Sequence, residues 1–405
     1  MQIHNNYTSS SYRFNIFYLF FVVLWPLIRG SFFSGFDAAE RIGWIMMAGA
    51  VFFNWSHLFR VPKVMLVWGV WIFYNIIITQ FKGYQMETPY IIWVLNVLIK
   101  PFVTLLVTYY AFRQNGDKTL KYLFYCWLVF VVLGMVTMEE STKDVLGEEV
   151  ARQSNVLGNS YVNSSVFLLT FAFCAQYKKI ISNKIFLIAC AIEVIAILLS
   201  GSRKGLSSVF IIFVISYIGR NPNMGMKQLF RVGVIAFAAY WVLQLIIQYS
   251  TAGYRFRAGM ETSDYADNWF LQLMGDRGFM YYYGWELFLD NPLTGIGLTN
   301  FRWSNPIRDL AMHSEYMVQL CECGIIGAYL FLSFYLGMTN RIKNLFSNIE
   351  NKQVAFSLLA TILGVLLMNF FAWSYSIVWF FVFFGFIFAY YDNAKQLKNQ
   401  TIKYG

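Results

Sequence analysis

The residues of this sequence best suited to chemistry are one histidine and several arginines. Of the three histidines in the chain, His313 lies directly before an apolar run that begins near Ser314. A helix starting there points the positive end of its dipole at the ring, which disfavours an imidazolium and favours a neutral, proton-accepting form. Such a ring can serve as a general base, although a lone histidine at a helix start is more often a capping or interfacial residue.

Arginine suits an anionic substrate, because its guanidinium stays charged and grips phosphate through a planar fork. The segment Gly201–Gly205 places Arg203 and Lys204 in a short connection between two apolar runs. Two adjacent cations at a membrane rim are costly without an anion, and a lipid-linked diphosphate would arrive at that depth. The alternative is contact with ordinary anionic headgroups, which we favour for Lys204, whereas Arg203 fits both interpretations.

Membrane-spanning helices must position these residues, because 58% of the chain is hydrophobic and only 13% is charged. A water-soluble surface cannot cover so many apolar side chains. A spanning helix needs about twenty apolar residues, so the chain has room for about twelve. We predict an all-α polytopic membrane protein with a single membrane domain over residues 1–405. The predicted spans cover residues 14–33, 41–57, 63–81, 89–111, 119–138, 156–177, 184–201, 205–219, 230–250, 314–338, 353–370 and 373–391.

The net charge of +10 is compatible with nucleic-acid binding or with orientation in a membrane. The basic residues are scattered over short connections instead of forming a stripe, so we expect no nucleic-acid partner. Cytoplasmic connections of membrane proteins are enriched in lysine and arginine. This rule predicts that both termini are cytoplasmic, that the acidic segment 139–149 is extracytoplasmic, and that His313 and Arg203 share the extracytoplasmic side.

The longest predicted extracytoplasmic loop, residues 251–312, exceeds the usual length of a simple connection. Within it, Gly278–Asp290 is expected to form an amphipathic helix whose large apolar residues recur at helical spacing. These residues are Tyr281, Trp285, Phe288 and Leu289. Asn291-Pro292 ends the helix, and Gly295-Ile296-Gly297 supplies a flexible turn. We expect a lid on the outer leaflet, with its aromatic residues anchored at the membrane interface; stacking on sugars is the alternative.

Lys100 and Glu193 are ionisable residues that fall inside predicted spans. Charges inside a membrane are functional candidates by default. The two can also pair with each other, and a structural salt bridge that holds the bundle is our preferred interpretation.

In three places the sequence resembles the O-antigen polymerase and O-antigen ligase superfamily of bacterial cell-surface polysaccharide assembly. Ser202–Gly205 (Ser-Arg-Lys-Gly) is similar to the family's Ser-Arg-x-Gly turn between two spans. Arg277–Trp285, followed by residues 291–301, is similar to an outer-loop pattern of Arg, Trp, Pro and Gly-x-Gly. His313–Tyr316 (His-Ser-Glu-Tyr), continuing to Glu322–Gly327, resembles a His-[Asn/Ser]-x-Tyr…Glu-x-Gly-x-x-Gly signature. Their order, spacing and shared outer placement make the resemblance specific over residues 150–330.

A fourth stretch, Arg152–Tyr161, resembles the family's Arg-x-x-Gly-x-x-x-Asn-Pro-Asn pattern but departs from it. Asn155 stands in place of the first glycine, and Ser160-Tyr161 stand in place of Pro-Asn. The resemblance is therefore weaker around Arg152 than at the other three places.

The resemblance implies a GT-C-like membrane glycosyltransferase at the extracytoplasmic face of the bacterial cytoplasmic membrane. Its reaction transfers a glycan from a polyprenyl diphosphate, such as undecaprenyl diphosphate, to a sugar hydroxyl, with no metal or other cofactor. His313 would take the acceptor proton, while Arg203 and Arg277 would stabilise the departing diphosphate without moving. The residues implied in substrate binding are Arg152, Lys204, Arg302, Arg308, Glu315 and Tyr316.

The same resemblance implies the partners of the protein. These are the polyprenyl-diphosphate-linked oligosaccharide, the lipid bilayer, a flippase and a chain-length regulator. Asp264 and Asp267 are a conceivable metal-binding pair in the long loop, but a solvated acidic loop is the preferred interpretation.

Three functions remain open from the sequence. A polymerase would transfer the growing glycan onto a fresh lipid-linked repeat unit of an O-antigen, capsule or exopolysaccharide. A ligase would transfer a finished glycan to lipid A core or another surface acceptor, with the same donor chemistry. A flippase or transporter of lipid-linked oligosaccharides is disfavoured, because no internal repeat is visible and few charges line the spans. We favour the polymerase, because the His-Ser-Glu-Tyr form resembles that branch of the superfamily.

Overall fold

The computed structural model describes residues 9–32, 36–57, 60–145, 148–200, 202–220, 234, 277–305, 312–347 and 349–404. Several predictions of the preceding section fall outside these residues. They are the span at 230–250, the part of the long loop that contains Asp264 and Asp267, and the predicted substrate contact of Arg308.

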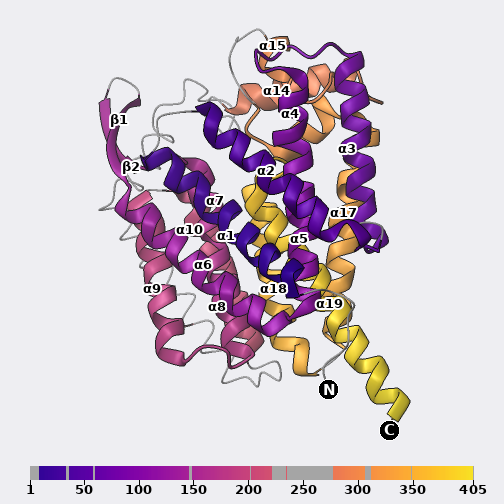
Figure 1. The fold of residues 1–405 in the computed structure, drawn as a ribbon. Helices are drawn as coiled ribbons and strands as arrows, with labels where there is room; N and C mark the ends of the chain where they lie inside the picture. Colours follow the sequence, from indigo (N-terminus) through magenta and orange to yellow (C-terminus); the bar gives the residue numbers. More distant parts are fainter. Residues whose placement is uncertain are drawn as a thin grey trace.

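The described residues form one bundle of helices that run up and down between two ends (Figure 1). The N-terminal half contains α1 (Ser9–Phe32), α2 (Phe36–Asn54), η1 (Trp55–His57), α3 (Lys63–Phe81), α4 (Tyr90–Trp93), the π-helix η2 (Val94–Ile99), α5 (Lys100–Gln114), α6 (Gly116–Val136), α7 (Asn159–Ser165), α8 (Phe167–Tyr177), α9 (Asn183–Ser200) and α10 (Arg203–Arg220). The C-terminal half contains α14 (Arg277–Asp290), α15 (Phe301–Ser304), α16 (Glu315–Met317), the π-helix η3 (Val318–Glu322), α17 (Gly324–Leu345), α18 (Ile349–Met368) and α19 (Val378–Tyr404).

Six helices among the described residues are long and apolar enough to cross a membrane. They cover Ser10–Arg29, Lys63–Phe81, Tyr90–Gln114, Gly116–Val136, Asn183–Ser200 and Asn351–Met368. These helices support the predicted class, a polytopic α-helical membrane protein, while the count of about twelve spans stays a prediction. Two predicted spans are interrupted in the structure. The span at 156–177 divides into α7 and α8 at Val166, and the span at 314–338 begins with α16 and η3 before α17 starts.

One element departs from the all-α prediction. The acidic segment forms a hairpin of two antiparallel strands, β1 (Glu139–Val145) and β2 (Glu148–Ser154), in which Glu139 pairs with Ser154 and Ser141 with Arg152. Neither strand alternates apolar and polar residues, which is the pattern that marks a half-buried strand in a sequence. The hairpin therefore had no sequence signal, and its pairing rests on backbone hydrogen bonds.

Aromatic side chains and glycines pack the interior of the bundle. Trp68 of α3 stacks on Trp71 at 4.5 Å between ring centroids and meets Phe334 of α17 at 4.9 Å. A Cβ atom added at Gly385 of α19 would lie 2.6 Å from the carbonyl oxygen of Leu105 in α5. Only a residue without a side chain allows this approach, so Gly385 sets the contact between α5 and the central helix α19.

The two ends of the bundle differ in what they carry. The upper end in Figure 1 carries α14, α15 and the β1–β2 hairpin, whereas α19 ends at the lower end. The start of α1 also lies at the lower end, because Tyr12 hydrogen-bonds to Thr119 near the start of α6, and Gly116 of α6 lies beside Asn393 of α19. Helix α1 therefore begins at the same end of the bundle at which α19 finishes.

Candidate functional site

His313 lies at the upper end, in an extended segment just before α16. Its ring stacks face to face on Trp373, with 5.3 Å between ring centroids and an interplanar angle of 4°. Both rings are half-buried, so solvent or a substrate can reach them. Ser314 caps the following helix by accepting a hydrogen bond from the backbone N–H of Met317. The histidine is thus held by an aromatic partner on one side and by a capped helix start on the other.

Glu315 ties this histidine segment to the connection between α18 and α19. Its side chain is fully buried, and its Oε2 accepts hydrogen bonds from the backbone N–H groups of Ser374 and Tyr375. Its Oε1 accepts from Gln319 at 2.8 Å, and its own backbone N–H donates to the carbonyl of Asn369. Since Trp373 precedes Ser374 directly, the Glu315 carboxylate holds the indole and the imidazole in register.

Tyr316 also has protein partners. Its hydroxyl donates to the carbonyl oxygen of Leu366 in α18 at 2.8 Å, and its ring meets Phe370 edge to face at 4.7 Å. The carboxylate of Glu315 and the hydroxyl of Tyr316, both predicted to bind substrate, therefore bond to the framework of the site.

Glu322 forms a second carboxylate clamp. The sequence analysis placed this residue in a signature but predicted no role for it. Its two oxygens accept from the backbone N–H groups of Thr299 and Phe301, at 2.8 and 3.2 Å. Its backbone carbonyl also accepts from Gly297, and the neighbouring Cys321 carbonyl accepts from Ile296. Ile296 and Gly297 make two of these four hydrogen bonds, so the Gly295-Ile296-Gly297 turn, predicted to be flexible, is held against η3.

Glycines allow this turn to approach η3 so closely. Gly295, Gly297 and Gly324 have φ values of 68°, 92° and 66°, a region that favours glycine. A Cβ at Gly324 would lie 2.5 Å from the carbonyl group of Leu293, and a Cβ at Gly295 would overlap the carbonyl group of Glu322. Gly295 and Gly324, which belong to two different signatures, therefore face each other across one tight backbone contact.

Arg302 lies just after this clamped turn, in α15. Its guanidinium carbon lies 5.5 Å from the ring centroid of Trp303. The adjacent Asn300 donates to the carbonyl of Gly83, which joins the turn to the connection between α3 and α4. In that connection, burial raises the pKa of Tyr84 to about 12, and the nearby Tyr90 adds to the rise, so the Tyr84 phenol stays neutral at physiological pH.

The helix predicted at 278–290 is present as α14, beginning at Arg277. It packs on the histidine segment, because a Cβ at Gly284 would lie 2.6 Å from Met312 and 3.0 Å from Met317. The hydroxyl of Tyr281 donates to the Phe370 carbonyl at 2.6 Å.

The face of α14 that packs on the bundle differs from the stripe of Tyr281, Trp285, Phe288 and Leu289. The close approach at Gly284 centres that face on Met280, Gly284 and Phe288. Trp285 and Leu289, expected on the same face as Phe288, are 50% and 58% exposed. Their exposure at the rim of the bundle suits contact with the membrane interface.

Arg203 begins α10 at the same upper end. Helix α10 runs antiparallel to α18, because Ser208 bonds to the carbonyl of Gly364 at 3.2 Å while Gly219 lies against Phe356. The distance along α10 from Ser208 back to Arg203 equals the distance along α18 from Gly364 on to Asn369. Arg203 therefore lies level with Asn369, the residue whose carbonyl accepts from the backbone of Glu315.

The structure therefore brings several predicted site residues to one end of the bundle. The helices and the hairpin place the backbones of Arg152, Arg203, Lys204, Arg277 and Arg302 at the end where His313 stacks on Trp373. Lys204 and Arg302 are half-buried. Within the part of the chain that the structure describes, no three His, Cys, Asp or Glu residues come together as metal ligands.

Sequence reasoning missed Trp373 and Glu322. Trp373 lies sixty positions from His313 inside an apolar run, so nothing in the sequence marks it as the stacking partner. Glu322 had a signal, because it is a charged residue inside a predicted span, and such residues are functional or structural candidates.

The described helices define a multi-pass membrane protein in which His313, stacked on Trp373, lies at the end of the bundle where the helices that start with Arg203 and Arg277 begin. Residues 186–332 match the family model described as O-antigen ligase. The matched range runs from α9 into α17 and contains Arg203, Arg277 and His313. The predicted assignment to the O-antigen polymerase and ligase superfamily is thus confirmed over this range. No curated protein matches the sequence.

Proposed function

We propose that this protein is a polysaccharide polymerase, which transfers a polyprenyl-diphosphate-linked glycan onto a sugar hydroxyl of a lipid-linked repeat unit. The observation that carries the proposal is the His313–Trp373 stack, held by Glu315 at the end of the bundle where Arg203 and Arg277 begin their helices. A clamped, solvent-reachable imidazole at the same end of the bundle as two helix starts that carry arginine suits proton abstraction near an anionic leaving group.

In the proposed reaction, His313 accepts the proton of the acceptor hydroxyl as its oxygen attacks the anomeric carbon of the donor glycan. The bond between that carbon and the diphosphate oxygen breaks, and the diphosphate leaves on its lipid with the bonding electron pair. Arg203 and Arg277 stabilise the growing charge, so the scheme requires no metal. Holding both lipid-anchored substrates in one place removes much of their translational freedom, which contributes up to about 7–11 kcal/mol.

The other predicted residues divide into two groups in this proposal. Arg152, Lys204, Arg302 and Arg308 would contact the diphosphate or sugar hydroxyls as cations. Glu315 and Tyr316, with protein partners of their own, serve the substrates by fixing the position of the histidine segment. Glu322 does the same for Arg302 through the clamped turn.

We place the site on the extracytoplasmic side, with both termini in the cytoplasm. Support comes from the lower end of the bundle, which carries the start of α1, the end of α19 and many basic residues. Those on described segments include Arg113, Lys118, Lys121, Lys178, Lys179, Lys343, Lys395 and Lys398. Cytoplasmic ends of membrane proteins are enriched in such residues.

A ligase is the second candidate, because the description of the matching family model names that activity and the match itself does not separate the two. Purified protein supplied only with lipid-linked repeat units distinguishes the two. A ladder of extended products supports the polymerase, whereas product that forms only after lipid A core is added supports the ligase. Movement of the intact substrate across the membrane, with no new glycosidic bond under either condition, would refute both and support a flippase.

A further inference from the structure

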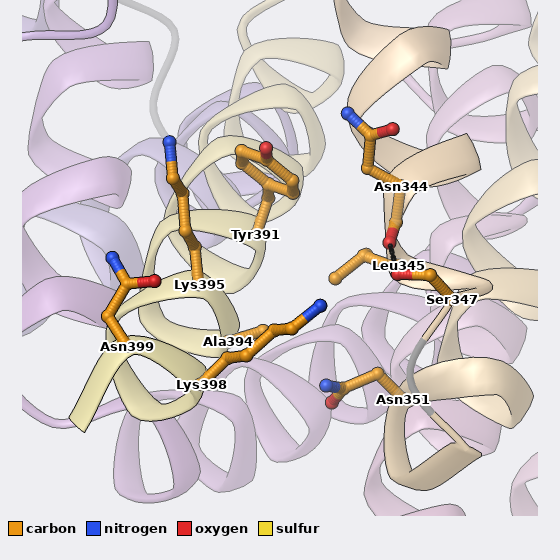
Figure 2. Close-up of a pocket in the computed structure, with 9 residues that line it drawn as sticks. All are labelled: Asn344, Leu345, Ser347, Asn351, Tyr391, Ala394, Lys395, Lys398 and Asn399. Atoms are coloured by element: carbon orange, nitrogen blue, oxygen red, sulfur yellow. Dashed lines mark hydrogen bonds between the residues drawn. The ribbon is translucent and has the colours of Figure 1, made fainter. Parts of the chain in front are cut away.

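A pocket of about 310 Å³ opens at the lower end of the bundle, opposite the histidine site. One wall is a face of α19, where Tyr391, Ala394, Lys395 and Lys398 recur at helical spacing (Figure 2). The other wall is the last turn of α17, the connection that follows it and the first turn of α18, which contribute Asn344, Ser347 and Asn351. Figure 2 shows Lys398 reaching from α19 across the opening toward the connection.

Among the described residues that line this pocket, the charged side chains are the positive ones of Lys395 and Lys398. Lys395 and Lys398 are exposed, and neither ammonium group has an ion-pair or hydrogen-bond partner among the described residues. Arg341 lies behind the wall, with its guanidinium carbon 5.6 Å from the ring centroid of Tyr391. Asp392, the next residue of α19, faces α5 instead, where its carboxylate accepts from the hydroxyl of Tyr109 at 2.8 Å.

Asn351 gives the pocket a fixed hydrogen-bond donor. Its side chain is 8% exposed, and its Oδ1 accepts from the hydroxyl of Tyr390 at 2.7 Å. This bond orients the amide, so that Nδ2, which has no partner among the described residues, is left as a donor at the pocket wall. The connection is itself braced, because Phe346 packs edge to face on Phe356 at 4.9 Å and Ser347 donates to the carbonyl of Asn344.

We propose that this pocket binds a phosphate-bearing anion through Lys395, Lys398 and the amide nitrogen of Asn351. Two ammonium groups and an oriented amide supply donors to phosphate oxygens from both walls. The volume holds a phosphate ester of the size of a glycerol or sugar phosphate. The site does not depend on the proposed transferase activity.

The position of the pocket suits a phospholipid headgroup as well as a soluble phosphate ester. Helix α17 has 22 residues and therefore spans about 33 Å, close to the thickness of the hydrocarbon core. The end of α17 at Leu345 thus lies about one hydrocarbon thickness from its start beside the histidine site. Both sources present the same phosphate chemistry to the same three residues.

The test uses the full-length protein in detergent, titrated with phosphatidylglycerol and followed by native mass spectrometry. The double variant Lys395→Gln/Lys398→Gln should raise the dissociation constant at least about tenfold, because each lysine near a headgroup contributes measurably to binding. The matched control is Lys118→Gln/Lys121→Gln. Those two exposed lysines have the same three-residue spacing at the start of α6, at the same end of the bundle. The control should change the constant less than about threefold.

A second variant tests the amide with little change of shape. In Asn351→Asp a carboxylate oxygen still accepts from Tyr390, so the packing is kept, but the donor becomes a negative charge. We expect a loss of binding similar to that of the double lysine variant. Binding that is unaffected by Asn351→Asp, or that falls no further in the double lysine variant than in its control, would overturn the proposal.

The source of the phosphate is read from a parallel titration with inorganic phosphate and glycerol 3-phosphate. Binding of glycerol 3-phosphate as tight as that of phosphatidylglycerol, and lost in the same variants, supports a soluble ester. Binding of phosphatidylglycerol alone supports a lipid headgroup. Absence of both from the wild-type protein would refute the site.

Discussion

Replacing Glu315 by glutamine tests whether this buried carboxylate positions His313, the proposed general base. Its oxygens face hydrogen-bond donors only, from the backbone of Ser374 and Tyr375 and from the side chains of Ser374 and Gln319. A glutamine would turn one oxygen into an NH2 group that points at a donor. Gln319 cannot relieve the mismatch by turning its own amide, because its Oε1 accepts from Trp71 at 3.0 Å.

The least costly arrangement of Glu315→Gln loses one strong hydrogen bond and buries one unsatisfied donor. Each of these effects costs about 1–3 kcal/mol, so we expect the free energy of unfolding to fall by about 2–6 kcal/mol. Displacement of the connection that carries Trp373 should also lower turnover by about a hundredfold, since a misplacement of about 1 Å has that effect. Chemical denaturation in detergent and the chain-extension assay measure the two quantities.

The matched control is Glu286→Gln in α14, which makes the same chemical change at an exposed position of the same end. It should alter the free energy of unfolding by less than about 0.5 kcal/mol and leave turnover unchanged. If Glu315→Gln matched this control in both measurements, the carboxylate clamp would have no role in holding the site. Lower stability with full turnover would instead restrict Glu315 to the fold.

Three further substitutions test the proposed site. His313→Ala should abolish glycan extension while the protein still reaches the membrane, and long-chain polysaccharide of normal amount in that variant would defeat the general-base role. Arg203→Lys should reduce extension at least about tenfold, because a point charge cannot replace the guanidinium fork, and full activity would indicate contact with headgroups only. Gly324→Ala should lower the unfolding free energy by about 2–4 kcal/mol, from backbone strain and overlap with Leu293. Gly83→Ala is its control, since Gly83 has a similar positive φ with open space around it, and equal losses in the two variants would exclude the overlap.

Helix positions were predictable from the sequence where the hydrophobic periodicity and the helix-ending residues indicate the same boundary. Asn291-Pro292 ends α14 at Asp290 as predicted, because proline cannot continue the hydrogen-bonded backbone. The alternation of apolar spans also predicts that His313, Arg203 and Arg277 emerge at one end, which their backbones do. Which face of α14 is buried was not predictable, since a glycine at the centre of that face carries no hydrophobic signal of its own.

Contacts between segments that are distant in the chain could not be predicted from the sequence, for a physical reason. The oxygens of Glu315 and Glu322 bond to backbone N–H groups, and every residue except proline has one, so no residue type marks the partner. The β1–β2 hairpin poses the same difficulty, because its pairing is made by backbone groups of polar residues. The stacking of His313 on Trp373 depends on the folded positions of two loops.

The π-helix η3 explains how one short signature serves two loops at once. Glu315 lies just before η3 and bonds to the connection at Ser374–Tyr375, while Glu322 ends η3 and bonds to the turn at Thr299–Phe301. Wider helical turns of this kind are rare and are concentrated at functional sites, because they redirect side chains within a continuous helix. The same segment therefore fixes the histidine through one carboxylate and the arginine-bearing loop through the other. In the proposed reaction, such a rigid frame would let charged groups stabilise a departing diphosphate without rearranging.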